Sequence, residues 1–309
     1  MKAILIKDYG GPEQFALDDV ADPDGGPGDI VVDIAAASLN PIDWKMRSGL
    51  VRKFFQFGFP HVVGRDFSGV VHSVGAEVEG FNPGDPVFGI ADVTRWGSHA
   101  EAIAVDQGMV AAKPKAIGHE AMAALGISAL TALAALEETA PVGSGDRILI
   151  HAGAGGVGHL AIQYAKHRGA QVLATARNSN HEFVRALGAD EAIDYTTTDF
   201  VEAAAGCDMV FDTMGGEVHR RSLEALAPGG VLVYIVAEPL PEGAGRPDVT
   251  VLNAPVRGER ASIERVAALA AEGVLKPAVE AKYPLSDFAE AFARLETGHS
   301  RGKIVFTMG

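Results

Sequence analysis

A short segment near the middle of the chain, from Ile148 to Gly158, constrains the fold more than any other. It reads ILIHAGAGGVG, an apolar run followed by Gly153, Gly155 and Gly158 in GxGxxG order. The run predicts a strand, and the residues after it predict a helix from Val157 to Arg168. In such a turn the first glycine permits a tight bend, the second admits a pyrophosphate, and the third lets helix and strand pack closely. We interpret the segment as a dinucleotide-binding turn; the alternative is a tight turn without a ligand.

Strand and helix patterns alternate around this turn. The predicted strands are 147–151, 171–176, 191–195, 209–212 and 231–236, with helical patterns between them. This alternation predicts a parallel, doubly wound sheet. The apolar run from Ala121 to Leu136 is shorter than the roughly 20 residues that span a bilayer, so we expect a buried helix there.

The first part of the chain follows a different rhythm. Short β-rich runs at 30–34, 67–74 and 86–90 are separated by turns of Gly, Pro, Asn and Asp, which predicts a small, mostly antiparallel barrel or folded sheet. The tail contains helical patterns at 262–273 and 288–297 and an apolar strand at 303–306. Because that strand needs a sheet to join, we expect the tail to return to the first domain.

The length of 309 residues agrees with two domains of roughly 150 residues each. We therefore predict an α/β protein. Its β-rich domain is expected at residues 1–120, completed by 262–309, and its dinucleotide-binding domain at residues 121–261.

The end of the second predicted strand of the sheet indicates which dinucleotide binds. A site for NAD usually has Asp or Glu there, to accept a hydrogen bond from the ribose 2′-hydroxyl. Here the strand ends at Ala176 and is followed by Arg177, a cation suited to a 2′-phosphate. The sequence thus favours NADPH; the alternative for Arg177 is a solvated surface arginine.

Composition excludes several kinds of partner and site. A net charge of −14 opposes binding to nucleic acid or to an anionic membrane. The single cysteine, Cys207, can form neither an internal disulfide nor a thiolate zinc site, which suits a reducing cytoplasm. The apolar run at the N-terminus is too short for a signal peptide. None of the ten histidines forms HExxH or another close ligand pair, so we expect no zinc.

Several segments together resemble the medium-chain dehydrogenase/reductase superfamily, in its zinc-independent quinone oxidoreductase branch, over nearly the whole chain. Zinc-dependent relatives carry Cys where Asn40 stands and His where Arg65 stands, so both catalytic metal ligands are missing. The segments that carry the resemblance are SLNPID at 38–43, GRDFSGVV at 64–71, GDPVFG at 84–89, the glycine turn at 153–158, LGAD at 187–190, IDY at 193–195 and GHSRGKIV at 298–305.

The resemblance implies a GroES-like catalytic domain, a Rossmann domain, NADPH in the cleft between them and a homodimer. The expected cofactor contacts follow in chain order: Asn40 and Thr131 near the nicotinamide, Gly155, Gly156 and Val157 on the pyrophosphate, Arg177 and Tyr195 at the 2′-phosphate, and Met214 and Gly215 at the cleft. Gly153 and Gly158 complete the cofactor-binding turn. The alternative for Asn40 is a turn residue bonded to its own backbone, and for Tyr195 a half-buried ring at a strand end.

A substrate pocket is expected around Asn40, Asp43, Trp44, Arg47 and Arg65. Several quinone reductases have tyrosines shortly after the Asn-x-x-Asp segment, whereas this chain has Trp44. The aromatic segment 54–59 is either a substrate wall or a packing segment. The proton donor is water or one of Lys45, Arg47 and Arg65, and we name no catalytic residue. Asp43 and Asp66 serve either local geometry or acid–base chemistry.

Without a metal to polarise an alcohol, the expected reaction is hydride transfer to an electrophile, either a quinone or the β-carbon of an α,β-unsaturated carbonyl. The developing enolate then needs hydrogen-bond donors. Two alternatives stay open. A 2-enoyl-thioester reductase needs a basic mouth, which an acidic chain does not favour. A non-catalytic NADPH-binding sensor or structural protein is compatible with the fold. The predicted strand 231–236, as an apolar edge, indicates a homodimer.

Overall fold

The computed structural model describes residues 1–236 and 245–308, and it divides the chain into two units. Unit 1 comprises Met1–Ile127, Gly258–Gly273 and Pro277–Gly309; unit 2 comprises Ser128–Arg257 and Val274–Lys276. The first boundary lies at 127 instead of the predicted 120 because helix α2 (His119–Leu133) runs through it, with a non-helical backbone at Gly126.

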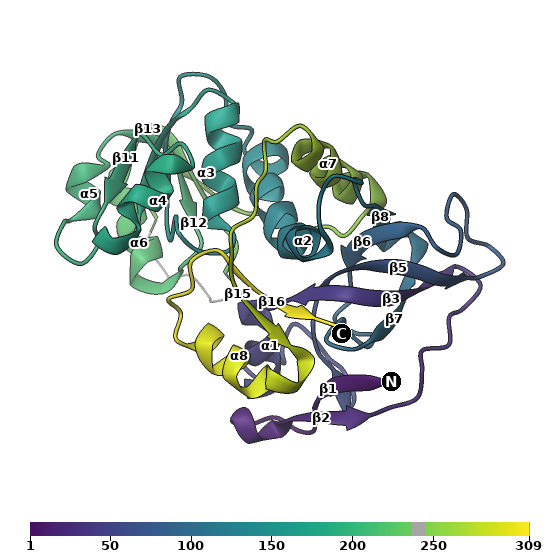
Figure 1. Cartoon of the computed structure of the whole chain (residues 1–309). Coiled ribbons are helices and arrows are strands. Elements are labelled where there is room, and N and C mark those ends of the chain that lie inside the picture. Colours follow the sequence, from purple (N-terminus) through teal and green to yellow (C-terminus); the bar gives the residue numbers. More distant parts are fainter. Residues whose placement is uncertain (237–244, 309) are drawn as a thin grey trace. The chain divides into compact units, whose positions relative to one another are not determined.

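Unit 1 contains a folded sheet of seven strands (Figure 1). Apart from the parallel pair β15–β16, its strands pair antiparallel, and β16 of the tail joins β3 as predicted. The strands, in sheet order, are β15 (Val279–Pro284), β16 (Lys303–Thr307), β3 (Asp29–Ser38), β5 (Asp66–Val74), β6 (Pro86–Ile90) and β8 (Val110–Ala112), with β7 (Ala102–Asp106) also pairing with β3.

A smaller sheet, three helices and the first part of α2 complete the described part of unit 1. The sheet has the order β2 (Phe15–Asp19), β1 (Lys2–Ile6) and β4 (His61–Val62). The helices are α1 (Pro41–Ser48), α7 (Arg260–Ala271) and α8 (Phe288–Glu296). Phe292 of α8 stacks on Phe15 with ring centroids 4.0 Å apart, and both belong to a core that also includes Leu39 and Phe306. The tail therefore supplies part of the core of the first unit.

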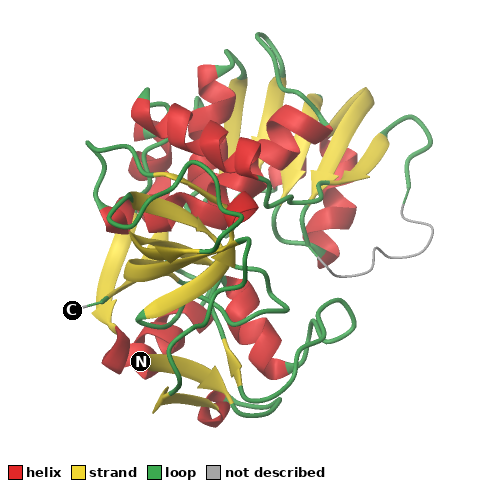
Figure 2. Ribbon diagram, turned by 90° about the vertical axis from the view of Figure 1, so that its right-hand side faces the viewer, coloured by secondary structure: helices red, strands yellow, loops and turns green. Residues whose placement is uncertain are grey.

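Unit 2 contains a parallel sheet with helices packed around it (Figure 2). The sheet has six strands, and the first of them in the chain, the strand that precedes the glycine turn, lies in its middle. This is the doubly wound order 3-2-1-4-5-6. The strands are β11 (Glu191–Ile193), β10 (Gln171–Thr175), β9 (Arg147–Ile150), β12 (Cys207–Asp212), β13 (Leu226–Tyr234) and β14 (Thr250–Asn253). The helices are α3 (Gly158–His167), α4 (His181–Ala186), α5 (Phe200–Ala203) and α6 (Gly216–Ala225).

Two sequence-based expectations about this sheet are wrong. The strand predicted at 231–236 is not an edge, because residues 231–234 of β13 pair with β14, which becomes the edge. Only Val251 and Leu252 of β14 are apolar, so its strand signal is weak. The strand predicted at 191–195 ends at Ile193, because Asp194 turns the chain by accepting hydrogen bonds from the backbone and hydroxyl of Thr196.

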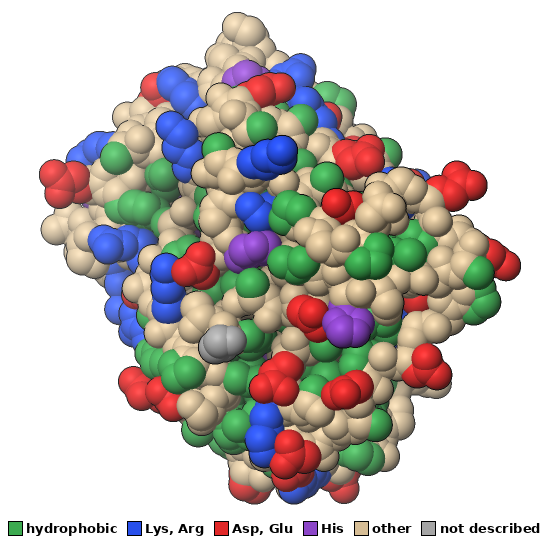
Figure 3. Space-filling view, turned by 45° about the vertical axis from the view of Figure 1, so that its right-hand side comes forward, with side chains coloured by type: hydrophobic (Ala, Val, Ile, Leu, Met, Phe, Trp, Pro, Cys, Tyr) green, Lys and Arg blue, Asp and Glu red, His purple; other side chains and the backbone are tan. Residues whose placement is uncertain are grey.

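The apolar run at 121–136 lies in a helix, as predicted. α2 continues into a π-helical segment, Ala134–Thr139, and the combined stretch His119–Thr139 is long and apolar enough to cross a membrane by length and composition alone. Its apolar window is 78% buried, as the core helix of a globular fold also is. On the face of the molecule drawn in Figure 3, acidic and basic side chains both occur among apolar ones.

Candidate active site

The glycine turn of unit 2 is packed as a dinucleotide turn requires. A Cβ on Gly158 would lie 2.2 Å from the carbonyl oxygen of Ala152, and one on Gly153 would lie 2.8 Å from Cβ of Ala174 on the neighbouring strand. Gly155 is more open, since its Cβ would meet the Ala152 oxygen at 3.2 Å. The outer glycines therefore serve close packing, and the middle one is less crowded, as the glycine that admits a pyrophosphate must be.

Helix α3 begins directly at this turn, at Gly158. The first amides of a helix have no partner within it, and with the helix dipole they form a site for an anion. His159 is turned inward and shares a 2.8 Å hydrogen bond with the Gly155 carbonyl, which fixes the loop. The turn thus fits a pyrophosphate, with Gly156, Val157 and Gly158 as the residues that would hold it.

The two residues predicted at the 2′-phosphate lie together. Nε of Arg177 donates a 3.0 Å hydrogen bond to the hydroxyl of Tyr195, and that tyrosine is 47% exposed. Asp194, which sequence analysis did not single out, accepts from the backbone N–H of Asn178 at 3.2 Å and so joins the two loops. The pair is exposed and cationic, as a site for a phosphate must be.

The turn after β12 is held by a buried carboxylate, Asp212. Its Oδ1 accepts from the backbone N–H groups of Met214 at 2.8 Å and Gly215 at 3.0 Å, and its Oδ2 lies 2.8 Å from Nδ1 of His219. Met214 itself is exposed, while Gly215 has a left-handed φ of 78°. Thr131, the remaining predicted cofactor contact in unit 2, is buried within α2.

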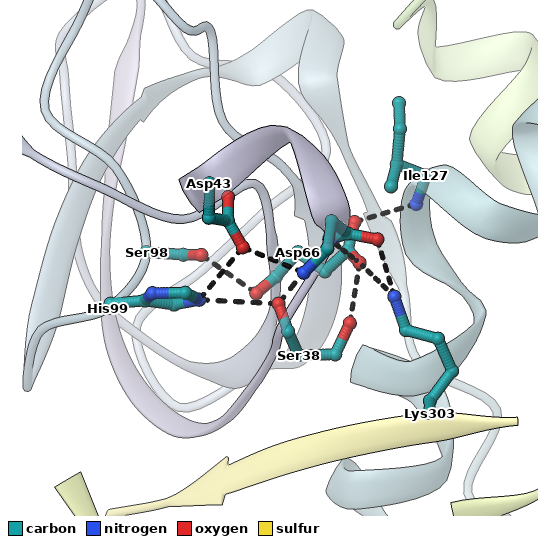
Figure 4. Close-up of polar contacts among 8 residues, drawn as sticks. Ser38, Asp43, Asp66, Ser98, His99, Ile127 and Lys303 are labelled. Atoms are coloured by element: carbon teal, nitrogen blue, oxygen red, sulfur yellow. Dashed lines mark hydrogen bonds and ion pairs between the residues drawn. The ribbon is translucent and has the colours of Figure 1, made fainter. Parts of the chain in front are cut away.

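Unit 1 contains a buried polar cluster centred on Asp66 (Figure 4). Its Oδ2 accepts from the Ser38 hydroxyl at 2.6 Å and from Nδ2 of Asn40 at 2.8 Å, and its Oδ1 accepts from the backbone N–H of Ile127 at 2.7 Å. That last bond explains the break in α2, because a Cβ on Gly126 would lie 2.4 Å from Oδ1 of Asp66.

The cluster holds a lysine that sequence analysis missed. Nζ of Lys303 lies 2.5 Å from Oδ1 of Asn40 and 3.4 Å from Oδ2 of Asp66. Lys303 is 3% exposed, and burial lowers the pKa of its ammonium group. Its only sequence signal is a charged residue opening the apolar strand Lys303–Thr307.

A second carboxylate, Asp43, lies next to this cluster. Its Oδ2 accepts from the backbone N–H of Asn40 at 2.7 Å and lies 3.8 Å from Nε2 of His99. Burial raises the pKa of Asp43 to about 7 and lowers that of His99 to about 4. Within residues 1–236 and 245–308, neither Oδ1 of Asp43 nor Nδ1 of His99 has a hydrogen-bond partner.

The other residues predicted around the substrate lie elsewhere in unit 1. Arg47 forms a bidentate ion pair with Glu296, at 2.7 and 3.2 Å, and its guanidinium packs over the ring of Phe15. These contacts occupy the side chain, so they do not support its predicted place in the substrate pocket. Nε of Arg65 donates to the Ala91 carbonyl at 2.7 Å, and burial lowers the pKa of this guanidinium. Nζ of Lys45 lies 5.8 Å from the ring centroid of Trp44.

The aromatic segment 54–59 is mainly a packing segment. Phe55 and Phe57 pack against the core that contains Leu39, and Phe57 stacks on His61 at 4.4 Å. Phe59 meets Tyr9 edge to face at 4.8 Å. Phe54 is 60% exposed.

The donor set around Asn40 does not suit a metal ion. The amide oxygen of Asn40 is taken by an ammonium group, and Arg65 is a cation. In the described part of the chain, no three His, Cys, Asp or Glu side chains lie together as metal ligands would.

Comparison with known proteins agrees with this geometry. Two domain families match, described as "Alcohol dehydrogenase GroES-like domain" at residues 26–115 and "Zinc-binding dehydrogenase" at residues 187–306. The chain is 36% identical to a 2-methylene-furan-3-one reductase of Solanum lycopersicum, covering 99% of this chain and 78% of that protein. It is 35% identical to a chloroplastic NADPH-dependent alkenal/one oxidoreductase of Arabidopsis thaliana, covering 99% and 79%.

A solved structure gives the same assignment. The quinone oxidoreductase from Coxiella burnetii superposes with a TM-score of 0.92 at 35% identity, over 99% of each chain. This chain therefore belongs to the medium-chain dehydrogenase/reductase superfamily, in its zinc-independent quinone oxidoreductase branch.

Proposed function

We propose that this chain is an NADPH-dependent, metal-free reductase that transfers a hydride to a quinone or to an α,β-unsaturated carbonyl compound. The observation that carries the proposal is the buried Asn40 amide, held by Asp66 and Lys303, at the position where the resemblance puts a zinc ligand in zinc-dependent relatives. The relatives named above as alkenal/one, furanone and quinone reductases support it.

NADPH, when bound, supplies the hydride. The residues that would hold it are Gly156, Val157 and Gly158, whose backbone amides lie at the start of α3, for the pyrophosphate, and Arg177 with Tyr195 for the 2′-phosphate. Arg177 is the one cation of this set, so it is expected to carry most of the preference for NADPH over NADH.

Hydride addition to the acceptor places negative charge on its oxygen. That charge is stabilised by donors already held in position. In unit 1 the Nδ2 group of Asn40 is such a donor, because Asp66 and Lys303 hold the amide on both sides. Water supplies the proton that completes the reduction.

The test is anaerobic oxidation of NADPH by the purified protein against quinones, enones and enoyl thioesters, with NADH in parallel. We expect turnover of a quinone or an enone. The Arg177→Ala variant is expected to lose about tenfold or more of its preference for NADPH, since hydrogen bonds to charged groups contribute about 1.5–3 kcal/mol. Arg185→Ala, an exposed arginine on α4, is the matched control and should keep the preference.

The other outcomes decide between the alternatives. Turnover of enoyl thioesters alone identifies a 2-enoyl-thioester reductase. NADPH binding with no turnover of any acceptor identifies a non-catalytic NADPH-binding protein and contradicts the proposal.

We also propose a reducing cytoplasm as the site of action and a homodimer as the assembly. The lone cysteine, Cys207, is buried, and burial raises the pKa of its thiol to about 11. Strand β14 is an edge of the unit 2 sheet, and such an edge offers backbone groups for pairing with a second copy. Cell fractionation and sedimentation equilibrium test these two statements, and a monomer would contradict the second.

A further inference from the structure

The Asn40 amide is held between two opposite charges. Its Oδ1 lies 2.5 Å from Nζ of Lys303, and its Nδ2 lies 2.8 Å from Oδ2 of Asp66. If the amide were rotated by half a turn, its NH₂ group would face the ammonium and its oxygen would face the carboxylate. Both contacts would then be repulsive, because an ammonium only donates and an ionised carboxylate only accepts. The two charges therefore set one orientation of the amide.

The second hydrogen on Nδ2 of Asn40 makes only a long hydrogen bond. It points toward the Ser38 carbonyl at 3.4 Å, at the far end of the hydrogen-bond range and much longer than the contact with Asp66. This hydrogen is the one that Asn40 can give to another acceptor without losing its contact with Asp66.

Lys303 also changes the strength of that donor. An ammonium group bonded to an amide oxygen draws electron density from the nitrogen, which makes the remaining N–H a stronger donor. The effect is large where water is excluded, and Asp66, Lys303 and Asn40 are 0%, 3% and 5% exposed. Solvent therefore screens the ammonium very little.

We propose that Lys303 is a positioning residue of the reductase: it orients and polarises the Asn40 amide so that the second Nδ2 hydrogen stabilises the negative oxygen of the reduced acceptor. The inference rests on the proposed function and adds to it the residue that activates the donor. Lys303 acts only through Asn40.

A purely structural role for Lys303, neutralising the buried Asp66, is the competing explanation. The two roles separate in a double variant, Lys303→Met with Asp66→Asn, which removes both charges and leaves neither buried alone. If neutralisation is the whole role, this variant recovers activity. If Lys303 polarises Asn40, the variant folds but stays slow.

The experiment compares the wild type with Lys303→Arg, Lys303→Met and the double variant on one enone or quinone. We expect kcat to fall about 10- to 100-fold in Lys303→Met and in the double variant, less than the loss of a whole oxyanion donor. The KM for NADPH should stay within about twofold, and Lys303→Arg should retain the larger share of kcat. Recovery of kcat in the double variant to within about twofold of wild type would overturn the proposal.

An NMR measurement on the wild-type protein tests the polarisation of Asn40 without turnover and without a variant. In ¹⁵N-labelled wild-type protein without cofactor, the side-chain amide protons of Asn40 should resonate downfield of those of Asn82 and Asn178. Resonances within the ordinary range would contradict polarisation. Wild-type turnover is measured separately, so failure of the inference and failure of the proposed function give different results.

Discussion

Two buried carboxylates, Asp66 in unit 1 and Asp212 in unit 2, gather their partners in opposite ways. The partners of Asp212 are two backbone amides and a histidine within the next seven residues. The partners of Asp66 come from 26 to 237 residues away: Ser38, Asn40, Ile127 and Lys303. The first carboxylate holds a turn, whereas the second brings a cation and an amide donor to one buried point.

The two carboxylates also differ in whether buried polar atoms near them lack hydrogen-bond partners. All four buried side-chain atoms without a partner in the described residues belong to unit 1, and two of them are Oδ1 of Asp43 and Nδ1 of His99 beside the Asp66 cluster. Unsatisfied buried polar groups cost stability. The Asp66 cluster therefore carries a stability cost that the Asp212 turn does not, as functional sites often do.

The largest expected effect separates the two carboxylates directly. Asp66→Asn leaves the ammonium of Lys303 buried without a full counter-charge, so the free energy of unfolding should fall by about 3–5 kcal/mol. Asp212→Asn keeps an acceptor for the Met214 and Gly215 amides and should cost about 1–2 kcal/mol. Chemical denaturation measures both free energies of unfolding. Equal losses in the two variants would contradict the claim that Asp66 and Asp212 have different roles.

Asp43→Asn should show that burying Asp43 lowers the free energy of unfolding by an amount that depends on pH. The folded-state pKa of Asp43 is about 7 against an ordinary value of 3.8, so unfolding releases a proton between these values. The contribution of Asp43 to wild-type stability therefore falls as the pH rises from about 4 to about 7. The variant lacks this loss and should exceed the wild type by up to about 4 kcal/mol at pH 8, since the shift is about three pKa units and each is worth about 1.4 kcal/mol.

Near pH 4 the two proteins should be equally stable. The contribution of His99, whose pKa of about 4 lies below its ordinary 6.5, rises with pH in both proteins and cancels in the difference. Denaturation midpoints at pH 4, 6 and 8 check this, and a difference that does not change with pH would show that Asp43 is ionised throughout.

Gly158→Ala probes the unit 2 turn instead. The added Cβ meets the Ala152 carbonyl at 2.2 Å, so we expect a loss of about 1–3 kcal/mol and weak NADPH binding. Gly155→Ala is the matched control for packing, because its Cβ would stand 3.2 Å from the same oxygen. Denaturation and fluorescence titration with NADPH measure both, and equal destabilisation by the two changes would contradict the packing role of Gly158.

The smallest effect concerns Arg47, the predicted pocket residue that the structure ties to Glu296. Glu296→Gln should lower the free energy of unfolding by about 1 kcal/mol and leave turnover unchanged. Glu290→Gln, an exposed change on the same helix, is the control and should change neither the free energy of unfolding nor turnover. A clear loss of turnover in Glu296→Gln would instead support the prediction that Arg47 lines the substrate pocket.

The same comparison explains what the sequence could predict. The glycine turn and the sheet around it depend on spacings of a few residues, so Gly153, Gly155 and Gly158 were predictable from their order alone. Arg177 and Tyr195 were predictable as a pair only through the resemblance. Strand β14 was missed because two apolar residues make no pattern.

The unit 1 cluster was less predictable because its members are distant in sequence. Asn40, Asp43 and Arg65 were predicted as site residues because of the resemblance. For Lys303 and His99, no nearby sequence pattern indicates that they lie beside Asp66. Only the pairing of β16 with β3 brings the tail beside Ser38. Burial then shifts the pKa values of Asp43, His99 and Lys303, which no spacing along the chain encodes.

The most direct test of the central claim follows the hydride itself. The purified protein is incubated with NADPH carrying deuterium at both positions on C4 of the nicotinamide and with a cyclic enone, in the presence of a metal chelator, and the product is examined by NMR. The account predicts one deuterium at the β-carbon of the saturated ketone, with a rate unaffected by the chelator. A saturated ketone without deuterium at that carbon, or a reaction that the chelator stops, would contradict it.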